Sequence, residues 1–205
     1  MRLTKLPLIL SDMGGVIIEF DNSYIAERYA ELFNIDPKKA NALIERYSEL
    51  LDINKIKIDE FFSIIAKELN ISKRRAREEW INTIKARAKV DRDIEEIYRS
   101  YKLKGYTIAY ITDVSRVSYL IEKRMNLIDY SLPDRIFISS YTGYSKKDPR
   151  AFYKVLDYYA VKPKEVVFID DRDQNIETAK KIGIRCIKYK DKDSFIKALR
   201  NELDE

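Results

Sequence analysis

Short apolar runs and longer amphipathic stretches alternate along this chain of 205 residues. The apolar runs lie at residues 6–11, 106–111, 136–138, 165–169 and 184–188. Uninterrupted runs of this length are typical of parallel strands that are buried on both faces. Stretches with apolar positions at helical spacing follow them, at residues 114–125, 149–159, 175–182 and from about 193 onward. Strands that alternate with helices in this way predict an α/β fold with a doubly wound parallel sheet.

Residues 23–101 have a different pattern, in which apolar positions recur at helical spacing throughout. This pattern predicts an insert of about four helices after the first strand. Asp36-Pro37 is a good helix start, with the Asp as cap and the Pro in the first turn. Asp59 and Ser72 are further candidate caps. The predicted organisation is an α/β core of residues 1–20 and 102–205 and a helical domain of residues 21–101.

The composition limits the kinds of catalytic and metal site that the protein can have and indicates its compartment. The sequence has no histidine, so catalytic triads and metal sites that use histidine are excluded. Its single cysteine, Cys186, excludes an internal disulfide and fits a reducing compartment; we interpret it as a buried strand residue. The apolar runs are too short to cross a bilayer and we recognise no signal peptide, which predicts a cytoplasmic protein without a membrane partner. Abundant Lys, Arg, Glu, Ile and Tyr beside a single Gln are typical of thermophile proteins.

The formal net charge is +5, from 39 Lys and Arg residues against 34 Asp and Glu residues. Basic and acidic residues are mixed almost everywhere, and the stretch from Lys73 to Arg77 is the one basic cluster. Glu78-Glu79 follow at once, so we interpret this stretch as a solvated helix face and expect no nucleic-acid partner. Nucleic-acid binding through this stretch is kept as a third hypothesis. A modest positive charge also suits an anionic small substrate.

Carboxylates, a hydroxyl and lysines follow the predicted strands. They are Asp12 after the first strand, Thr112 and Asp113 at the end of the second, Lys146 and Lys147 around the third, and Asp170 and Asp171 after the fourth. In an open parallel sheet, ligands bind beyond the carboxyl ends of the strands. We therefore expect these side chains to gather at one edge of the sheet.

Phosphoryl transfer is the chemistry that this set of groups supports. A carboxylate such as Asp12 attacks phosphorus to give an aspartyl-phosphate, which divides a difficult hydrolysis into two steps. Because nucleophile and substrate are both anionic, a cation must lie between them, and Mg²⁺ prefers oxygen ligands. Asp12 and the acids after the fourth strand would supply such ligands, with the Gly14 carbonyl as a further one. The Thr112 hydroxyl would donate to a phosphoryl oxygen, and a lysine of the pair 146–147 would neutralise charge in the transition state.

These four motifs, in this order and spacing, resemble those of the haloacid dehalogenase (HAD) superfamily. The matching segments are Leu8–Val16, Thr112, Lys146-Lys147-Asp148-Pro149 and Val166–Asn175. The resemblance covers nearly the whole chain outside the helical insert, and that insert is similar to the helical cap of the family. It implies a Rossmann-like core, with Asp12 as nucleophile and Lys146 rather than Lys147 as the catalytic lysine. It also implies that Asp171 is the direct Mg²⁺ ligand and Asp170 a supporting one. From the residues alone, we interpret Asp113 as the cap of a helix beginning at Val114, with a contact to the phosphoryl group as the further option.

One position departs from the phosphatases of that family, which usually carry a second Asp, the general acid and base, two residues after the nucleophile. Here the residue is Gly14, which cannot donate a proton, and such help is worth roughly 10²–10⁴-fold in rate. Three interpretations stay open: a substrate with a better leaving group, such as a sugar 1-phosphate or an acyl phosphate; a replacement acid, with Glu19 and Asp21 as candidates; or a catalytically impaired relative. Relatives that resemble sugar-phosphate phosphatases also begin with Asp-x-Gly-x-Val, which favours the first two. The dehalogenase branch usually carries Tyr at this position, so dehalogenation is less favoured.

The sequence therefore predicts a Mg²⁺-dependent, HAD-like phosphoric monoester hydrolase of small phosphorylated metabolites, sugar phosphates among them. The reaction would pass through an aspartyl-phosphate on Asp12, with Thr112, Asp113 and Lys146 binding the phosphoryl group. The alternatives are a HAD-like binding protein without turnover and a dehalogenase-type hydrolase. The expected partner is a phosphorylated small molecule, and the expected assembly is a monomer or homodimer. Tyr141 and Tyr144 are candidates for lining the mouth of the site.

Overall fold

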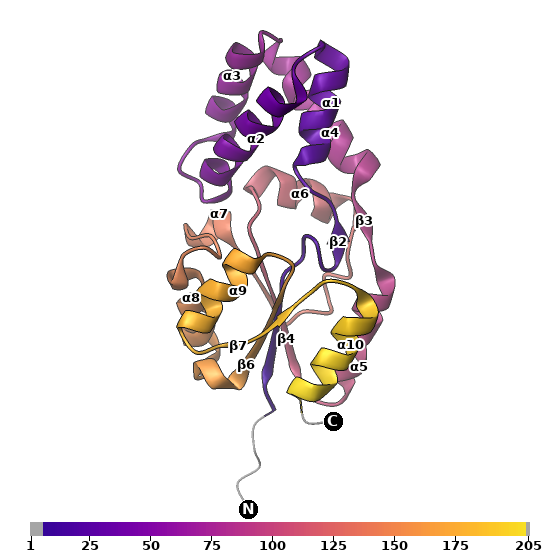
Figure 1. Cartoon of the computed structure of the whole chain (residues 1–205), viewed down its shortest axis with the longest axis vertical. Coiled ribbons are helices and arrows are strands. Elements are labelled where there is room, and N and C mark those ends of the chain that lie inside the picture. Colours follow the sequence, from indigo (N-terminus) through magenta and orange to yellow (C-terminus); the bar gives the residue numbers. More distant parts are fainter. Residues whose placement is uncertain (1–5, 204–205) are drawn as a thin grey trace, which may run out of the picture.

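The computed structural model describes residues 6–203 of the chain. Residues 1–5 and 204–205, which the prediction above places in the α/β core, lie outside the described residues. Figure 1 shows a sheet with helices on both sides and a further group of helices above it. Within residues 6–203, no helix combines the length and the apolar character that crossing a membrane requires.

A five-stranded parallel sheet forms the centre of the molecule. Its strands are β1 (Leu8–Ser11), β4 (Thr107–Thr112), β5 (Arg135–Ile138), β6 (Val166–Asp170) and β7 (Arg185–Lys188). They lie in the order β5-β4-β1-β6-β7, and every neighbouring pair is parallel. The central strands are buried along their whole length, as expected for strands covered on both faces. The predicted doubly wound α/β fold is confirmed.

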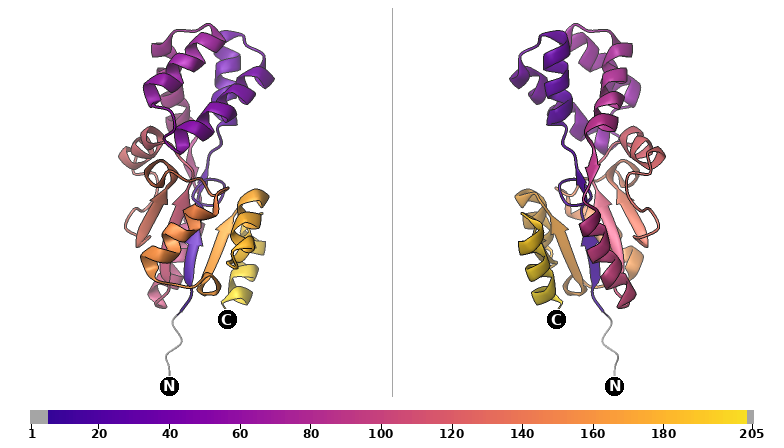
Figure 2. Two further views of the ribbon diagram at one scale, coloured as in Figure 1. Left: turned by 90° about the vertical axis from the view of Figure 1, so that its left-hand side faces the viewer. Right: turned by 90° about the vertical axis from the view of Figure 1, so that its right-hand side faces the viewer.

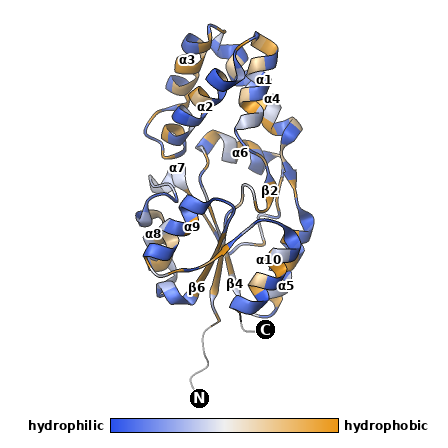
Figure 3. Ribbon diagram, viewed as in Figure 1, coloured by the Kyte–Doolittle hydropathy of each residue, from blue (hydrophilic) through white to orange (hydrophobic). Residues whose placement is uncertain are grey.

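Two helices cover each face of the sheet. They are α5 (Arg92–Leu103) and α10 (Lys192–Glu202) on one face, and α8 (Pro149–Tyr159) and α9 (Asp173–Lys181) on the other. Successive strand residues point to opposite faces, so Ile9 packs with α5 and α10 while Leu8 and Leu10 pack with α8 and α9. Figure 3 shows the apolar strands between helices whose outer faces are polar. The core of this part therefore consists of two apolar layers, one on each side of the sheet.

The helical insert forms a bundle with its own apolar core. Its helices are α1 (Ser23–Phe33), α2 (Pro37–Asp52), α3 (Ile58–Leu69) and α4 (Lys73–Arg87). Phe61, Phe62 and Trp80 meet edge to face, with ring centroids 5.0–5.9 Å apart. The cluster around them also includes Ile121 of α6 (Arg116–Arg124), the helix that lies between the bundle and the sheet. The bundle therefore packs on the rest of the molecule mainly through α6.

A two-stranded antiparallel ribbon joins the bundle to the sheet. It consists of β2 (Ile18–Glu19), where the chain leaves the sheet, and β3 (Lys89–Val90), where it returns. Figure 2 shows this narrow connection and the bundle standing at one end of the sheet. β3 was not predicted, because two residues are too few to produce a pattern. The short α7 (Ser139–Thr142) and the 3₁₀ turn at Pro163–Glu165 were not predicted for the same reason.

Helix starts in the bundle follow the predicted caps in two cases and differ in one. The Asp36 carboxylate accepts a hydrogen bond from the Lys39 amide at 2.9 Å, and the Ser72 hydroxyl accepts one from the Arg75 amide at 3.2 Å. The prediction that Asp59 is a cap is wrong. Helix α3 begins at Ile58, so Asp59 lies in its first turn.

The helix α5 packs on the sheet although most of it lies within the predicted helical domain of residues 21–101. Its residues Ile94, Tyr98 and Tyr101 belong to an apolar layer of the sheet. The division of the chain into two domains stays a prediction. This packing would place the end of a helical domain near residue 90 rather than 101.

Candidate active site

Asp12 follows the central strand β1 directly, and its carboxylate is buried and fixed. Its backbone amide donates to the Ile169 carbonyl at 2.8 Å, which extends the β1–β6 pairing by one residue. Its Oδ1 accepts a hydrogen bond from the Met13 amide at 2.7 Å. The chain then turns sharply, because the Ile17 and Ile18 amides both bind the Met13 carbonyl. Asp12 therefore has one oxygen held by the backbone, while Oδ2 forms an ion pair with Lys146.

Lys146 is almost fully buried and lies between two carboxylates. Its ammonium forms ion pairs with Asp12 Oδ2 and, at 2.9 Å, with Asp170 Oδ2. Burial alone would lower the pKa of Lys146, but the charges of Asp12, Asp170 and Asp113 outweigh it and raise that pKa. The structure thus provides a permanent positive charge beside the predicted nucleophile. Lys147, the other lysine that the sequence offered, instead forms an ion pair with Glu49 of α2.

Asp113 positions Lys146 and does not cap a helix. Its two carboxylate oxygens each lie 3.1 Å from the Lys146 backbone amide. Helix α6 begins at Arg116, and its cap is Ser115, whose hydroxyl accepts from the Ser118 amide at 3.1 Å. The interpretation of Asp113 as the cap of a helix beginning at Val114 is therefore wrong.

Three carboxylates form a cluster at the carboxyl ends of β1 and β6. One oxygen each from Asp12, Asp170 and Asp171 can be chosen so that all three lie within 4.8 Å of one another. Burial raises the pKa values of Asp12 and Asp171, and the charge of Asp170 raises both further. Lys146 opposes this effect in both cases and Arg172 also opposes it for Asp171, so these two cations balance part of the negative charge.

Asp170 and Asp171 differ in the contacts that they already make. Asp170 accepts hydrogen bonds from the Arg172 amide at 2.8 Å and from Asn175 Nδ2 at 3.1 Å, besides its ion pair with Lys146. Asp171 Oδ1 is buried and has no hydrogen-bond partner among the described residues. A buried carboxylate oxygen without a partner is costly unless a cation approaches it. Asp12 and Asp171 therefore fit direct Mg²⁺ ligands, and Asp170 fits a supporting role.

The two glycines after the nucleophile have different surroundings. Gly15 has φ +75°, and a Cβ at this position would overlap the Asp171 carboxylate. A Cβ at Gly14 would meet nothing within 4 Å. Gly15 is therefore required by the acidic cluster, whereas space for a side chain is left at position 14.

A cavity of about 270 Å³ lies between the acidic cluster and the helical bundle. Its sheet side contains Asp12, Gly14, Thr112, Asp113, Lys146 and Asp171. Its bundle side contains the aromatic residues Phe20, Tyr24 and Trp80. The structure thus brings the predicted catalytic and phosphate-binding residues to one edge of the sheet. Tyr141 and Tyr144, predicted for the mouth, are not among the residues that line the cavity.

Two acids of this cavity were not found from the sequence. They are Asp52, the last residue of α2, and Glu122 of α6. Burial is the main cause that raises the pKa of Asp52 to about 8 and that of Glu122 to about 7. Both carboxyl groups are thus substantially protonated at neutral pH. No local motif marks either residue, because each reaches the cavity only through the packing of its helix.

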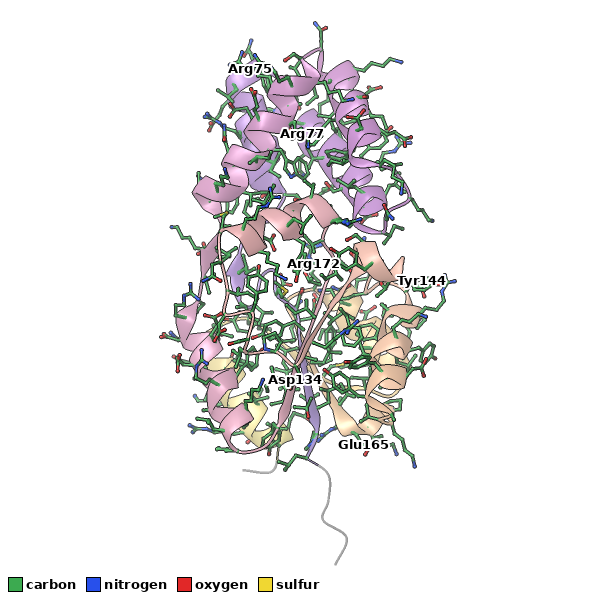
Figure 4. The ribbon with its side chains drawn as sticks, turned by 180° about the vertical axis from the view of Figure 1, so that it is seen from behind. Arg75, Arg77, Asp134, Tyr144, Glu165 and Arg172 are labelled. Atoms are coloured by element: carbon green, nitrogen blue, oxygen red, sulfur yellow. The ribbon has the colours of Figure 1, made fainter. Side chains whose placement is uncertain are left out.

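Arg172 is a third residue that was not named as a site residue from the sequence, although it lies within the segment Val166–Asn175. It lines the cavity, and its guanidinium lies 3.3 Å from Asp21 in the segment after β2. Figure 4 shows Arg172 near the carboxyl ends of the strands, with Arg75 and Arg77 far away in the bundle. The basic stretch from Lys73 to Arg77 is therefore remote from the cavity.

The sequence of the chain is similar to the sequences of known proteins. A family model described as haloacid dehalogenase-like hydrolase matches residues 6–183. The glyceraldehyde 3-phosphate phosphatase of Pyrococcus furiosus is 33% identical over 92 residues, which cover 43% of this chain and 37% of that protein. The chain spans only 14–42% of the length of the curated relatives that it matches first.

Solved structures share the fold over most of their length. A HAD-like family hydrolase from Porphyromonas gingivalis gives a TM-score of 0.79 at 18% identity, covering 98% of this chain and 99% of that one. A HAD family enzyme from Bacteroides thetaiotaomicron, solved with magnesium and inorganic phosphate, gives a TM-score of 0.74 at 19% identity. The match covers 90% of this chain and 94% of that one. At such identities the likeness shows a common fold.

Proposed function

The chain belongs to the haloacid dehalogenase-like hydrolases, and from this premise we propose that it is a Mg²⁺-dependent phosphatase of small phosphorylated metabolites. The observation that carries the proposal is the position of Asp12. Its buried carboxylate lies between the Lys146 ammonium and the Asp171 carboxylate, at the sheet side of a cavity large enough for a small substrate.

The residues of the chain divide the work of phosphoryl transfer among them. The Thr112 hydroxyl and the Lys146 ammonium bind the phosphoryl oxygens, and Asp12 Oδ2 attacks phosphorus to form an aspartyl-phosphate. Water then hydrolyses this intermediate and returns Asp12 to its starting state. Asp113 holds the Lys146 backbone in place throughout. Mg²⁺, bound by Asp12, Asp171 and the Gly14 carbonyl with support from Asp170, would neutralise charge between the two anions.

We propose that the helices α1–α4 act as a cap over the site. Two contacts attach the end of α2 to the core: the ion pair between Glu49 and Lys147, and a 2.6 Å hydrogen bond from Ser139 Oγ to the Asp52 carbonyl. A cap in this position excludes water from the reaction and selects the substrate. Opening would need these contacts to break while the β2–β3 ribbon bends.

The cavity suggests what kind of molecule is cleaved. Its volume of about 270 Å³ fits a molecule of the size of a sugar phosphate, and aromatic residues such as Tyr24 and Trp80 suit a sugar face. The relative from Pyrococcus furiosus is a phosphatase of a three-carbon sugar phosphate by its name. We also propose a cytoplasmic protein, because the half-buried thiol of Cys186 suits a reducing compartment. Its proposed assembly is a monomer or a homodimer.

Hydrolysis of p-nitrophenyl phosphate with Mg²⁺ tests the proposed activity. We expect turnover by the wild-type chain and none above background for Asp12→Asn, which keeps the shape of the side chain but not its charge or nucleophilicity. Equal activity in the two proteins would contradict the proposal. If Mg²⁺ and phosphate bound tightly but no phosphate ester were turned over, the second candidate function would apply. That candidate is phosphate binding without catalysis, which the lack of an acid at Gly14 favours.

A further inference from the structure

Gly14 leaves the proposed reaction without a proton donor for the leaving oxygen, and another residue of the cavity can take that role. We infer that Asp52 of α2 is the general acid, and that it reaches the leaving oxygen from the bundle side of the cavity. The inference rests on the proposed phosphatase activity. It differs from the sequence-based expectation, which named Glu19 and Asp21 as candidates.

The direction of attack places the leaving oxygen on the side of Asp52. In phosphoryl transfer the attacking and leaving oxygens lie roughly in line on opposite sides of phosphorus. Asp12 attacks from the sheet side of the cavity, so the leaving oxygen points to the bundle. Asp52 lines the same cavity and comes from a helix of that bundle.

The backbone of Asp52 is fixed by the core of the molecule. Ser139 Oγ lies 2.6 Å from the Asp52 carbonyl and 3.0 Å from the Val114 amide, so one hydroxyl connects α2 with the loop after β4. Three residues earlier in α2, Glu49 forms its ion pair with Lys147. Asp52 is therefore held against the loop that follows Thr112 and the loop that carries Lys146, and closure of the cap would deliver it to the site.

The charges around Asp52 keep its proton in place at neutral pH. Burial and the negative charge of Asp113 disfavour ionisation, and Glu122 on α6 adds a small contribution of the same sign. Arg172 at the start of α9 and the Ser115 backbone act in the opposite direction. The balance raises the pKa of Asp52 to about 8. A carboxylic acid with such a pKa can give a proton to an alkoxide and take one from water.

Glu122 is the strongest competitor for the role. It is buried, lines the cavity and has a pKa raised to about 7. Burial is the only resolved cause of that shift, whereas for Asp52 the charge of Asp113 is the second cause after burial. Because Asp113 directly follows Thr112, the effect of its charge on Asp52 favours Asp52 over Glu122 for a role beside the phosphate-binding groups.

The two acids named from the sequence are less suited to the role. Glu19 and Asp21 line the cavity but are exposed. Asp21 already accepts hydrogen bonds from the Ser23 amide at 2.7 Å and from Arg172 at 3.3 Å. The Asp21 carboxylate is therefore engaged by other groups of the chain, and both side chains are open to solvent rather than enclosed in the cavity.

The step balances in protons and electron pairs. As the bond from Asp12 Oδ2 to phosphorus forms, the ester P–O bond breaks and its electron pair stays on the leaving oxygen. The proton of Asp52 moves to that oxygen, so the product leaves as a neutral alcohol. The Asp52 carboxylate then takes a proton from the water that attacks the aspartyl-phosphate. This releases phosphate and restores both acids to their starting states.

Two aryl phosphates with different leaving groups test the assignment. p-Nitrophenolate is stable without a proton, whereas phenolate is the poorer leaving group and gains from a general acid. For Asp52→Asn we expect kcat/KM to fall by roughly 10²-fold with phenyl phosphate and by less than about tenfold with p-nitrophenyl phosphate. The ratio kcat/KM covers only the steps up to loss of the leaving group, so slow hydrolysis of the intermediate does not obscure the result.

Further variants separate an acid from a residue that merely supports the fold. Glu45→Gln, at an exposed position of the same helix, serves as the matched control. In the Asp52→Asn background, Gly14→Asp should restore at least part of the phenyl phosphate activity, because the structure leaves room for a side chain there. The decline of kcat/KM for phenyl phosphate above about pH 8 should be present in the wild type and absent in Asp52→Asn.

Specific outcomes would overturn the inference. Equal losses with both substrates would show a structural role for Asp52, and a larger selective loss in Glu122→Gln would assign the acid to α6 instead. If the wild-type chain cleaved neither ester, the proposed function would fail and this inference with it. Activity of the wild type together with unchanged kcat/KM in Asp52→Asn would overturn the inference alone.

Discussion

The Lys146 ammonium lies 2.9 Å from the Asp170 carboxylate, and both side chains are almost fully buried. The same ammonium forms an ion pair with Asp12 on its other side. A single buried cation therefore holds together residues from opposite ends of the chain. This arrangement makes the site dependent on charge balance for its stability as well as for its chemistry.

Lys146→Met should reduce both stability and activity. Breaking a buried ion pair by removal of one partner typically costs about 3–5 kcal/mol, because the remaining charges are left uncompensated. The loss of one positive group at the transition state should also lower kcat by about 10²–10³-fold. Urea denaturation and p-nitrophenyl phosphate assays measure the two effects, and Mg²⁺ should restore part of the stability.

Lys147→Met, which removes a more exposed ion pair, should change stability by only about 0–1 kcal/mol. Equal effects of the two substitutions would contradict the account.

Asp171→Asn should weaken Mg²⁺ binding without unfolding the chain. Its buried Oδ1 has no partner in the described structure, so the side chain contributes mainly to a bound cation. Loss of a residue that only supports a metal ligand typically lowers the affinity for the metal by roughly 10–100-fold. Loss of a direct ligand should lower the affinity for Mg²⁺ by at least this factor. Thermal unfolding at increasing Mg²⁺ concentration measures this, because a ligand that binds only the folded state stabilises it.

Asp173→Asn is the matched control for this measurement. Asp173 is exposed, lies two residues further along, and pairs with Lys188 at 2.8 Å. It should keep the wild-type response to Mg²⁺. A wild-type response in Asp171→Asn as well would remove Asp171 from the proposed metal site.

The adjacent glycines should respond in opposite ways to alanine. Gly15→Ala should cost about 1–2 kcal/mol from the left-handed backbone alone, and the new Cβ would displace the Asp171 carboxylate. Mg²⁺ should therefore raise the melting temperature of Gly15→Ala by less than it raises that of the wild type. Gly14→Ala should fold normally and keep that rise, because a Cβ there meets nothing. If Gly15→Ala bound Mg²⁺ as well as Gly14→Ala does, the proposed role of Asp171 would be wrong.

Much of the sheet and its edge is predictable because the signals are local. The fully buried strand Val166–Asp170 shows as an apolar run, and Asp148 before Pro149 caps α8, its carboxylate accepting from the Arg150 amide at 2.9 Å. Parallel strands bring their carboxyl ends to one edge, so the position of Asp12 near Asp170 follows from topology. The assignment of α5 to the sheet does not follow in this way, since an amphipathic pattern shows that a helix buries one face but not against what.

Residues that depend on helix docking were not predictable. Asp113 looked like a cap because it precedes an amphipathic stretch, yet Ser115 performs that function and Asp113 binds the Lys146 amide. Asp52 ends a helix and carries no motif, and only the packing of α2 on α7 brings it to the cavity. A carboxyl group in the bundle, far along the sequence from Asp12, gives no local signal of its environment.

Asp52 should also make the stability of the fold depend on pH. Its pKa is about 8 in the folded state and about 3.9 in an unfolded chain. Because the folded state holds this proton more tightly, the associated stability is complete below about pH 4 and is lost as the pH rises to about 8. For this group alone the loss approaches about 1.4 kcal/mol per pH unit at most, and access to solvent reduces it. Asp52→Asn removes this dependence, so the urea midpoint of the variant should exceed that of the wild type increasingly from pH 5 to pH 8. A constant difference between the two proteins over this range would show that Asp52 ionises normally, and it would then lack the proton that the proposed catalytic step requires.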